Sequence, residues 1–298
     1  MSFRGGLKTI LVATDLHGEA EAALEYARKL AGAYGSRIVL AHGLDPLEYA
    51  DVHNLPMQVL GELNGQAQGV LKKLAGDLMA EGIHSHSEIR QGDVVQTLLD
   101  VARDYEAGLI VIGSKGREGA GPVVVGAITE RLVRTAHCPV LAVAADWNAG
   151  PNRPAAGGPV MLSIERNEAA KEAVRTAYSL AEAFRRHLLI VHVRTPAEAT
   201  AFLNPCSTRV EDYGIRPGSN VTVDCMVKDG DTRQAIMEAI GQRHPSILVI
   251  GVKRTSHTPG PHGTAFTLLA RSRVPVLCVP PLPDGRAAEQ EEAVAIEM

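Results

Sequence analysis

The two halves of the chain repeat the same order of short apolar runs. The run LIVIG at 109–113 returns as ILVIG at 247–251, and CPVLAV at 138–143 returns as VPVLCV at 274–279. Runs of this length, separated by helix-length segments, are typical of parallel strands that are covered by helices on both faces. The chain is therefore expected to contain two copies of one α/β fold.

Each copy is expected to alternate strands and helices, which predicts a parallel sheet with right-handed crossovers. In the first copy the expected strands are 7–13, 37–42, 85–90, 109–112 and 140–143, and the expected helices are 19–31, 57–80, 94–105 and one that begins just after Gly126. In the second copy the expected strands are 159–164, 188–193, one near 224–232, 246–251 and 274–279, with a helix at 167–186. The second copy is shorter by about one helical segment in its middle.

The boundary between the copies is expected at residues 148–159, which are rich in Pro and Gly. We expect an N-terminal domain at 1–147, a linker at 148–158 and a C-terminal domain at 159–283. The remaining tail, 284–298, is acidic and is expected to be disordered.

Composition excludes several classes of protein. The formal net charge is −4, so no basic surface favours nucleic acid or anionic membranes. No apolar run approaches the roughly 20 residues of a spanning helix, and a cytoplasmic protein is predicted. Of the four cysteines, Cys138, Cys225 and Cys278 lie in or beside expected strands and are predicted to be buried thiols, whereas Cys206 is predicted to be exposed.

A glycine-rich loop follows the apolar run at 109–112. Glycines permit close backbone approach to an anion, so successive N–H groups of such a loop can turn toward phosphate oxygens. A helix that starts after Gly126 would place its positive end at the far side of the loop. The alternative is a plain strand-to-helix connection that needs several positive φ angles. The loop residues are Gly113, Lys115, Gly116, Arg117, Gly119, Gly121 and Gly126.

The spacing of three of these glycines resembles the nucleotide loop of the universal stress protein family. Two residues separate Gly113 from Gly116, nine separate Gly116 from Gly126, and residues 129–143 resemble that family's closing helix and strand. One position departs from the pattern, because Ala127 stands where nucleotide-binding members carry Ser or Thr. The loss of one neutral hydrogen bond costs roughly 0.5–1.5 kcal/mol, which would weaken binding without removing it.

The resemblance implies a doubly wound, five-stranded parallel sheet of order 3-2-1-4-5 in each copy, as in adenine nucleotide alpha hydrolase-like folds. It implies ATP or AMP as the ligand, with or without Mg²⁺, and a nucleoside held by Asp15 and by the backbone at Ala13 and Gly43. Asp15 could instead cap the following helix, and the loop's two cations could be surface charges. Thr129 could partly replace the missing hydroxyl. The phosphates would be held by Gly113, Lys115, Gly116, Arg117, Gly126 and the amides of Ala127 and Ile128.

The second copy departs further from the pattern. Glu165 matches Asp15, Arg254 matches Gly116, and the loop 252–262 carries two prolines, although Gly263 and Thr264 keep the family's Gly-Ser/Thr pair. We expect this copy to bind no nucleotide in the ordinary way.

Four histidines are candidate site residues by their positions in or beside expected strands. His42 and His192 end matching strands and are interpreted as structural, while His84 and His86 lack the partners of a metal site. No catalytic residue and no metal ligand is predicted.

The predicted function is a stress-response regulator that binds ATP or AMP through its first copy, with at most slow hydrolysis. The two copies are expected to pack as an intrachain pseudo-dimer, and a homodimer is a further expectation. One alternative is a nucleotide-independent interaction scaffold, which Ala127 and the altered second loop favour. A weaker alternative is a nucleotide-hydrolysing enzyme.

Overall fold

The computed structural model describes residues 7–16, 18–45, 57–114, 125–147, 157–165, 169–194, 220–253 and 263–281. The first half contains β1 Thr9–Ala13, α1 Gly18–Tyr34, β2 Arg37–Leu44, α2 Met57–Ala80, β3 Ser85–Gln91, α3 Val94–Asp104, β4 Leu109–Gly113, α4 Ala127–Thr135 and β5 Val140–Val143. The second half contains β6 Val160–Ile164, α5 Ala170–Phe184, β7 Leu188–Arg194, β8 Val223–Asp229, α7 Thr232–Arg243, β9 Ile247–Gly251, α8 Thr264–Arg271 and β10 Val276–Val279. The alternation expected from the sequence is confirmed, and the helix expected at 57–80 has those bounds.

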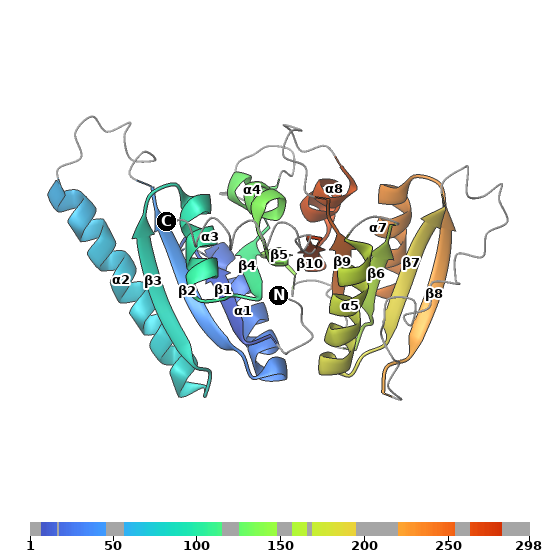
Figure 1. Cartoon of the computed structure of the whole chain (residues 1–298), viewed down its shortest axis with the longest axis horizontal. Helices are drawn as coiled ribbons and strands as arrows, with labels where there is room; N and C mark the ends of the chain where they lie inside the picture. The colour runs from blue at the N-terminus through green and yellow to red at the C-terminus, as the bar shows by residue number, and fades with distance from the viewer. Residues whose placement is uncertain are drawn as a thin grey trace, which may run out of the picture.

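The described strands form one ten-stranded sheet of order β3-β2-β1-β4-β5-β10-β9-β6-β7-β8. The first half therefore has the expected order 3-2-1-4-5. The second half has the same order when it is read from β8 toward β10. The two sheets are not separate, because β5 pairs antiparallel with β10, with Leu141 opposite Leu277. This pairing gives hydrogen-bond partners to two edges that would otherwise be open. In Figure 1, β3 and β8 form the two ends of the sheet, and α2 lies outside β3.

Helices cover both faces of the sheet, and the two core clusters show which helix lies on which face. One cluster contains residues of α1, α2 and α5, and the other contains residues of α3, α4, α7 and α8. Successive strand residues alternate between the clusters, as Ile10 and Val12 lie in the first and Leu11 and Ala13 in the second. Each cluster includes residues from both halves, so the cores continue across the β5–β10 seam.

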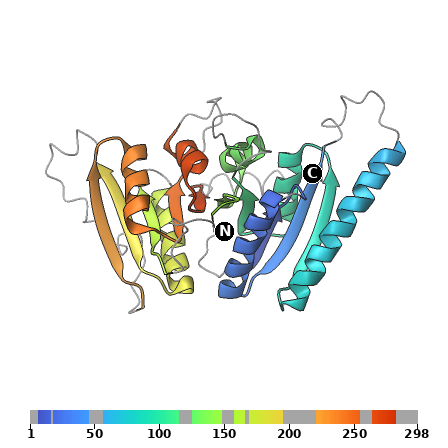
Figure 2. The same ribbon diagram turned by 180° about the vertical axis from the view of Figure 1, so that it is seen from behind.

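Side chains also join the two halves at this seam. The Arg134 guanidinium of α4 lies 4.4 Å from the ring centroid of Phe266 in α8. On the opposite face, the buried Trp147 packs edge-to-face against Tyr26 of α1, and the Tyr26 hydroxyl donates to Ser246 O at 3.4 Å. α4 and α8 lie side by side in both views of the molecule (Figures 1 and 2).

The prediction for the cysteines needs one correction. Cys138 and Cys278 are buried, and burial raises the pKa of each thiol to about 12. Cys225 is exposed, because it lies on β8, which pairs only with β7 and forms an edge of the sheet. Cys206, the tail at 284–298 and most of the linker lie outside the described residues. Among the described helices, none has the length and apolar character needed to cross a membrane.

Candidate functional site

The carboxyl ends of β1 and β4 lie next to each other in the sheet. Val12 pairs with Val111, so the register brings the residues after Ala13 alongside Gly113 at the end of β4. β2 pairs with β1 on its other side, with Ala41 opposite Ala13. In doubly wound sheets ligands bind at this edge, where the order of winding reverses. The structure therefore brings together Ala13, Asp15, Gly43 and Gly113, all at the carboxyl ends of neighbouring strands.

The turn after β1 is held in an uncommon backbone conformation. Leu16 has a φ of 65°, and its N–H donates to the Thr14 hydroxyl oxygen at 3.0 Å. His42, on β2, donates from Nδ1 to Thr14 O at 2.8 Å, which is the structural role expected for this histidine. A left-handed, non-glycine residue costs of order 1–3 kcal/mol, and such residues are enriched at functional sites. Asp15 lies in this turn and is exposed.

Gly43 has a packing role that the sequence did not reveal. A Cβ atom at this position would lie 3.0 Å from Val94 Cα, in the first turn of α3. The absence of a side chain thus seats α3 on the end of β2. Asp93 is the N-cap of this helix and accepts from the Gln96 N–H at 2.9 Å. Hydrogen bonds from Arg131 and from Gln96 hold the pKa of Asp93 below its usual value.

The helix after the glycine loop begins without a side-chain cap. Gly126 is the N-cap of α4 and donates its own N–H to Ser114 O at 3.2 Å, while Gly126 O accepts from the Glu130 N–H at 2.9 Å. The N–H groups of Ala127 and Ile128 fall in the first turn, where a helix offers no internal acceptors. They lie at the positive end of the helix dipole. The predicted residues Lys115, Gly116 and Arg117 lie outside the described residues.

Thr129 does not stand in for the hydroxyl that is missing at Ala127. Its side chain is buried, and its hydroxyl donates to Gly113 O at 2.8 Å. The bond fastens the first turn of α4 to the end of β4. The expectation from the sequence is corrected here, because the hydroxyl hydrogen is committed to the strand.

Sequence reasoning missed Ser114, which follows directly after β4. Ser114 is 3% exposed, and its hydroxyl has no hydrogen-bond partner in the described part of the chain. Its backbone is well held, since its N–H donates to Val143 O at 2.9 Å. A buried polar atom without a partner is uncommon, and a water molecule, an ion or a bound ligand can supply the missing partner. The signal in the sequence was a single hydroxyl residue between a buried strand and a glycine loop.

The second half keeps the backbone plan of the site but not its side chains. Val252 takes the place of Ser114, and its N–H donates to Val279 O at 2.9 Å. In this region the two halves are offset by 136 residues, as from Pro139 to Pro275, so Ala265 takes the place of Thr129. Because alanine has no hydroxyl, the bond from Thr129 to the preceding strand has no counterpart at Ala265. α8 also begins at a glycine without a side-chain cap, Gly263, and Glu165 is exposed after β6. Arg254 and the two prolines lie outside the described residues.

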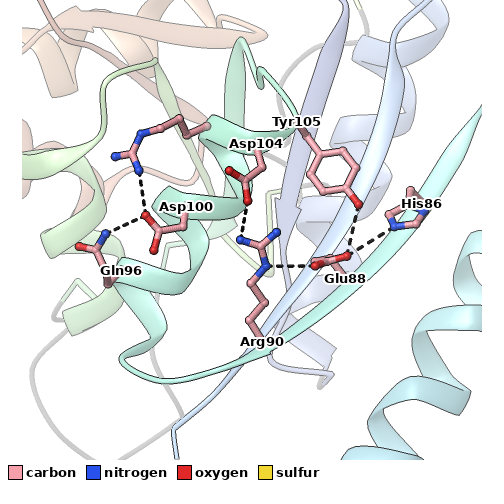
Figure 3. A network of polar contacts seen from close by, with 8 residues as sticks. His86, Glu88, Arg90, Gln96, Asp100, Asp104 and Tyr105 are labelled. Atoms are coloured by element: carbon pink, nitrogen blue, oxygen red, sulfur yellow. Dashed lines mark hydrogen bonds and ion pairs between the residues drawn. The ribbon is translucent and has the colours of Figure 1, made fainter. Parts of the chain in front are cut away.

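A second group of polar side chains lies at the outer edge of the first half (Figure 3). Glu88 of β3 accepts from Arg90 at 3.0 Å and from the Tyr105 hydroxyl at 3.3 Å, and it lies 3.5 Å from His86. Arg90 also pairs with Asp104 of α3 at 2.7 Å. These polar side chains therefore pair with one another, and their pairing holds the edge strand β3 to α3. Among the described residues, no group of three metal-binding side chains gathers here or elsewhere.

Comparison with known proteins gives a family for the first half. Residues 6–144 match the model of the Universal stress protein family. Universal stress protein MJ0531 of Methanocaldococcus jannaschii is 27% identical over 141 residues, which cover 46% of this chain and 81% of the relative. A universal stress protein of Mycolicibacterium smegmatis is 29% identical over 192 residues, which cover 62% of this chain and 63% of the relative.

A likeness of fold extends over both halves. The crystal structure of a universal stress protein from Archaeoglobus fulgidus superposes with a TM-score of 0.72 at 19% identity, and the match covers 91% of this chain and 98% of that one. A putative universal stress protein from Pseudomonas aeruginosa superposes with a TM-score of 0.65 at 20% identity, covering 97% of this chain and 98% of the other. The chain therefore shares its fold with these two structures.

Proposed function

Because residues 6–144 belong to the universal stress protein family, we propose that this half of the chain binds ATP or AMP where β1 and β4 end. Where Mg²⁺ accompanies the triphosphate, it is part of the ligand, and no protein side chain is proposed to bind it. The bound nucleotide regulates a stress response in the cytoplasm. The second half supports the first, and two chains associate as a homodimer.

The observation that carries the proposal is the open first turn of α4. The N–H groups of Ala127 and Ile128 have no intrahelical acceptor, and the Gly126 cap adds no side chain in front of them. A helix terminus of this kind favours phosphate, because its N–H groups and its dipole both attract negative charge. Asp15 lies at the same edge of the sheet, where a carboxylate can accept from ribose hydroxyls. In the proposal, Lys115, Gly116 and Arg117 complete the phosphate site.

Ser114 supplies a test of whether the residues present fit such a ligand. Its hydroxyl is buried and unpartnered within the described residues, and its carbonyl accepts from the N–H of Gly126. A phosphate oxygen held at the start of α4 would give this hydroxyl the acceptor that it lacks. In this reading Ser114 takes over the hydrogen bond lost with the hydroxyl at Ala127.

We propose that the nucleotide is sensed rather than consumed, with at most slow hydrolysis. The acidic residue nearest to the start of α4 in sequence is Glu130, and its carboxylate is paired with Arg134 at 3.0 Å. A general base needs a free acceptor within hydrogen-bond reach of the attacking water. An ion-paired carboxylate is poorly suited to that role.

The proposal is tested by isothermal titration of the nucleotide-free chain with Mg·ATP and, separately, with AMP. About one site per chain is expected. About two sites would contradict the supporting role of the second half. No heat at millimolar concentrations of either nucleotide would favour the alternative, a nucleotide-independent interaction scaffold, for which Ala127 and the changed side chains of the second half are the evidence.

A change at Ser114 should separate binding from stability. Ser114→Val copies Val252, which occupies the same backbone position in the second half. Burial of an unpartnered hydroxyl destabilises a protein, so the variant should melt at the same temperature as the unmodified chain or higher. The same change should weaken Mg·ATP binding about 2- to 10-fold, since one hydrogen bond is lost. Unchanged affinity in titration calorimetry would remove Ser114 from the proposed site.

A further inference from the structure

α3 and α4 are joined by a two-point ion pair between the N-cap of α3 and the middle of α4. Arg131 Nη1 lies 2.8 Å from Asp93 Oδ2, and Arg131 Nη2 lies 3.1 Å from Asp93 Oδ1. This fork arrangement fixes the direction of the guanidinium as well as its distance. Asp93 is at the same time the N-cap of α3, through the Gln96 N–H. One carboxylate therefore sets both the start of α3 and the lateral position of α4.

The pair completes a series of contacts around the proposed nucleotide site. α3 is seated on the end of β2 through Gly43, and α4 is fastened to the end of β4 through the bond from Thr129 to Gly113. β2 and β4 lie on opposite sides of β1. The ion pair between Asp93 and Arg131 thus links the helix seated on β2 to the helix seated on β4. It fixes the nucleoside side of the site relative to the phosphate side.

This link differs from the others in its exposure. The side chains of Arg131 and Asp93 are 56% and 44% exposed, whereas Thr129 is 2% exposed. Exposed ion pairs contribute little to folding stability, because water screens them and the side chains lose freedom. The pair is therefore poorly explained as a device for stability. Its two-point geometry indicates instead that the pair fixes the position of α4 relative to α3.

The second half lacks the link, although it keeps the helices. Asp231 caps α7 through the Gln234 N–H at 3.0 Å, as Asp93 caps α3. Its ion pair, however, is with Arg233 of the same helix at 3.2 Å. Thr267 lies 136 residues after Arg131 and takes its place on α8. α7 and α8 are in contact, yet no ion pair joins them among the described residues.

We propose that Asp93 and Arg131 are positioning residues for nucleotide binding, which hold the open first turn of α4 at the correct distance from the end of β2. This inference rests on the proposed nucleotide function of the same half. Neither residue needs to touch the ligand. The pair acts by preorganising the two sides of the site before the nucleotide arrives.

A competing role for Arg131 makes an opposite prediction. If Arg131 were a phosphate ligand, removal of the Asp93 charge would free the guanidinium and tighten binding. If the pair positions α4, removal of either charge should weaken binding. Asp93→Asn is suited to this comparison, because asparagine is as good an N-cap as aspartate and keeps the start of α3.

The test is calorimetric titration of the full chain with Mg·ATP, together with the melting temperature of each variant. Arg131→Met and Asp93→Asn should each raise the Kd about 3- to 10-fold, and the double variant should be no weaker than either single one. Arg131→Lys should recover part of the affinity. The melting temperature should change by no more than about 2 °C, as for other exposed ion pairs. Arg103→Met is the matched control, because Arg103 pairs with Asp100 at 2.9 Å within α3 alone, and it should leave the Kd unchanged.

The outcomes separate this inference from the proposed function. Tighter binding by Asp93→Asn, or an unchanged Kd in both single variants, would overturn the positioning role and leave the nucleotide function in place. Additive losses in the double variant would also overturn it, because they would show two independent contacts. No heat from the unmodified chain would overturn both.

Discussion

Gly126→Val is expected to abolish the binding of Mg·ATP by this chain. Gly126 precedes the N–H groups of Ala127 and Ile128, which are the proposed phosphate donors, and it contributes no side chain in front of them. The added isopropyl side chain would occupy the space through which a phosphate must approach. The fold should survive the change, because the φ of −58° and ψ of 137° at this residue suit a β-branched side chain. Loss of a glycine N-cap in favour of valine costs about 1 kcal/mol.

Two neighbouring variants make the result specific. Gly126→Ala adds one methyl group and should weaken binding by an intermediate amount. Ala127→Ser restores the hydroxyl that nucleotide-binding members of the family carry and should tighten binding about 2- to 10-fold. Circular dichroism should give the same spectrum for all three variants. Undiminished heat from Gly126→Val would show that the nucleotide binds elsewhere than at the start of α4.

The strands and helices could be predicted from the sequence because each is marked by a local pattern. β4 and β9 are continuous apolar runs that end in glycine, at Gly113 and Gly251, and both faces of these strands are buried. α2 has apolar residues at helical spacing, and the side chains of Leu71 and Leu78 are fully buried against the sheet. Patterns of this kind depend on neighbours within about two turns, so a single sequence contains them.

The arrangement of the two halves could not be predicted in the same way. β5 and β10 are both short apolar strands, and nothing in their periodicity tells whether they pair or remain separate edges. The pairing depends on surfaces that form only after each half has folded. For the same reason Cys225 was expected to be buried, since a strand residue at the sheet edge has the same local pattern as one in the centre.

The candidate site was predictable where it depends on glycine spacing and not where it depends on contacts between distant segments. Asp15, Gly113 and Gly126 are proposed from their positions after strands and before a helix. The pair of Asp93 and Arg131 spans 38 residues and joins two helices, so no local pattern indicates it. Ser114 escaped notice because its lack of a partner is a property of the folded chain. These residues carry charges or hydroxyls whose partners only the fold decides.

Gly158→Ala is expected to destabilise the second half strongly. Gly158 is buried just before β6, and a Cβ atom there would lie 2.1 Å from His244 O, a distance that no side chain tolerates. Either the turn at His244 or the start of β6 would have to move. The N–H of Ser246 donates to Pro159 O at 2.9 Å, so a shift would also disturb the pairing of β6 with β9. Overpacking of this kind costs about 3 kcal/mol.

Gly157→Ala is the matched control, because it changes the adjacent residue in the same way. A Cβ atom at Gly157 would meet only the end of a flexible side chain, Arg186 Nη1, at 3.3 Å, and the variant should be close to the unmodified chain in stability. In thermal unfolding, the melting temperature of Gly158→Ala should be about 6 °C lower than that of the unmodified chain. The fluorescence of Trp147, the single tryptophan, should follow the same transition, because it packs at the seam against Tyr26.

The prediction at Gly158 also separates effects at the amino ends of the strands from effects at their carboxyl ends. Gly158 lies at the amino end of β6, whereas the proposed nucleotide site lies at the carboxyl ends of β1 and β4 in the other half. Below its melting temperature the variant should therefore bind Mg·ATP with the affinity of the unmodified chain. Equal stability of Gly158→Ala and Gly157→Ala would show that the turn at His244 yields without cost. A loss of nucleotide affinity in Gly158→Ala alone would show instead that strain crosses the β5–β10 seam, and the second half would then take part in binding through the shared sheet.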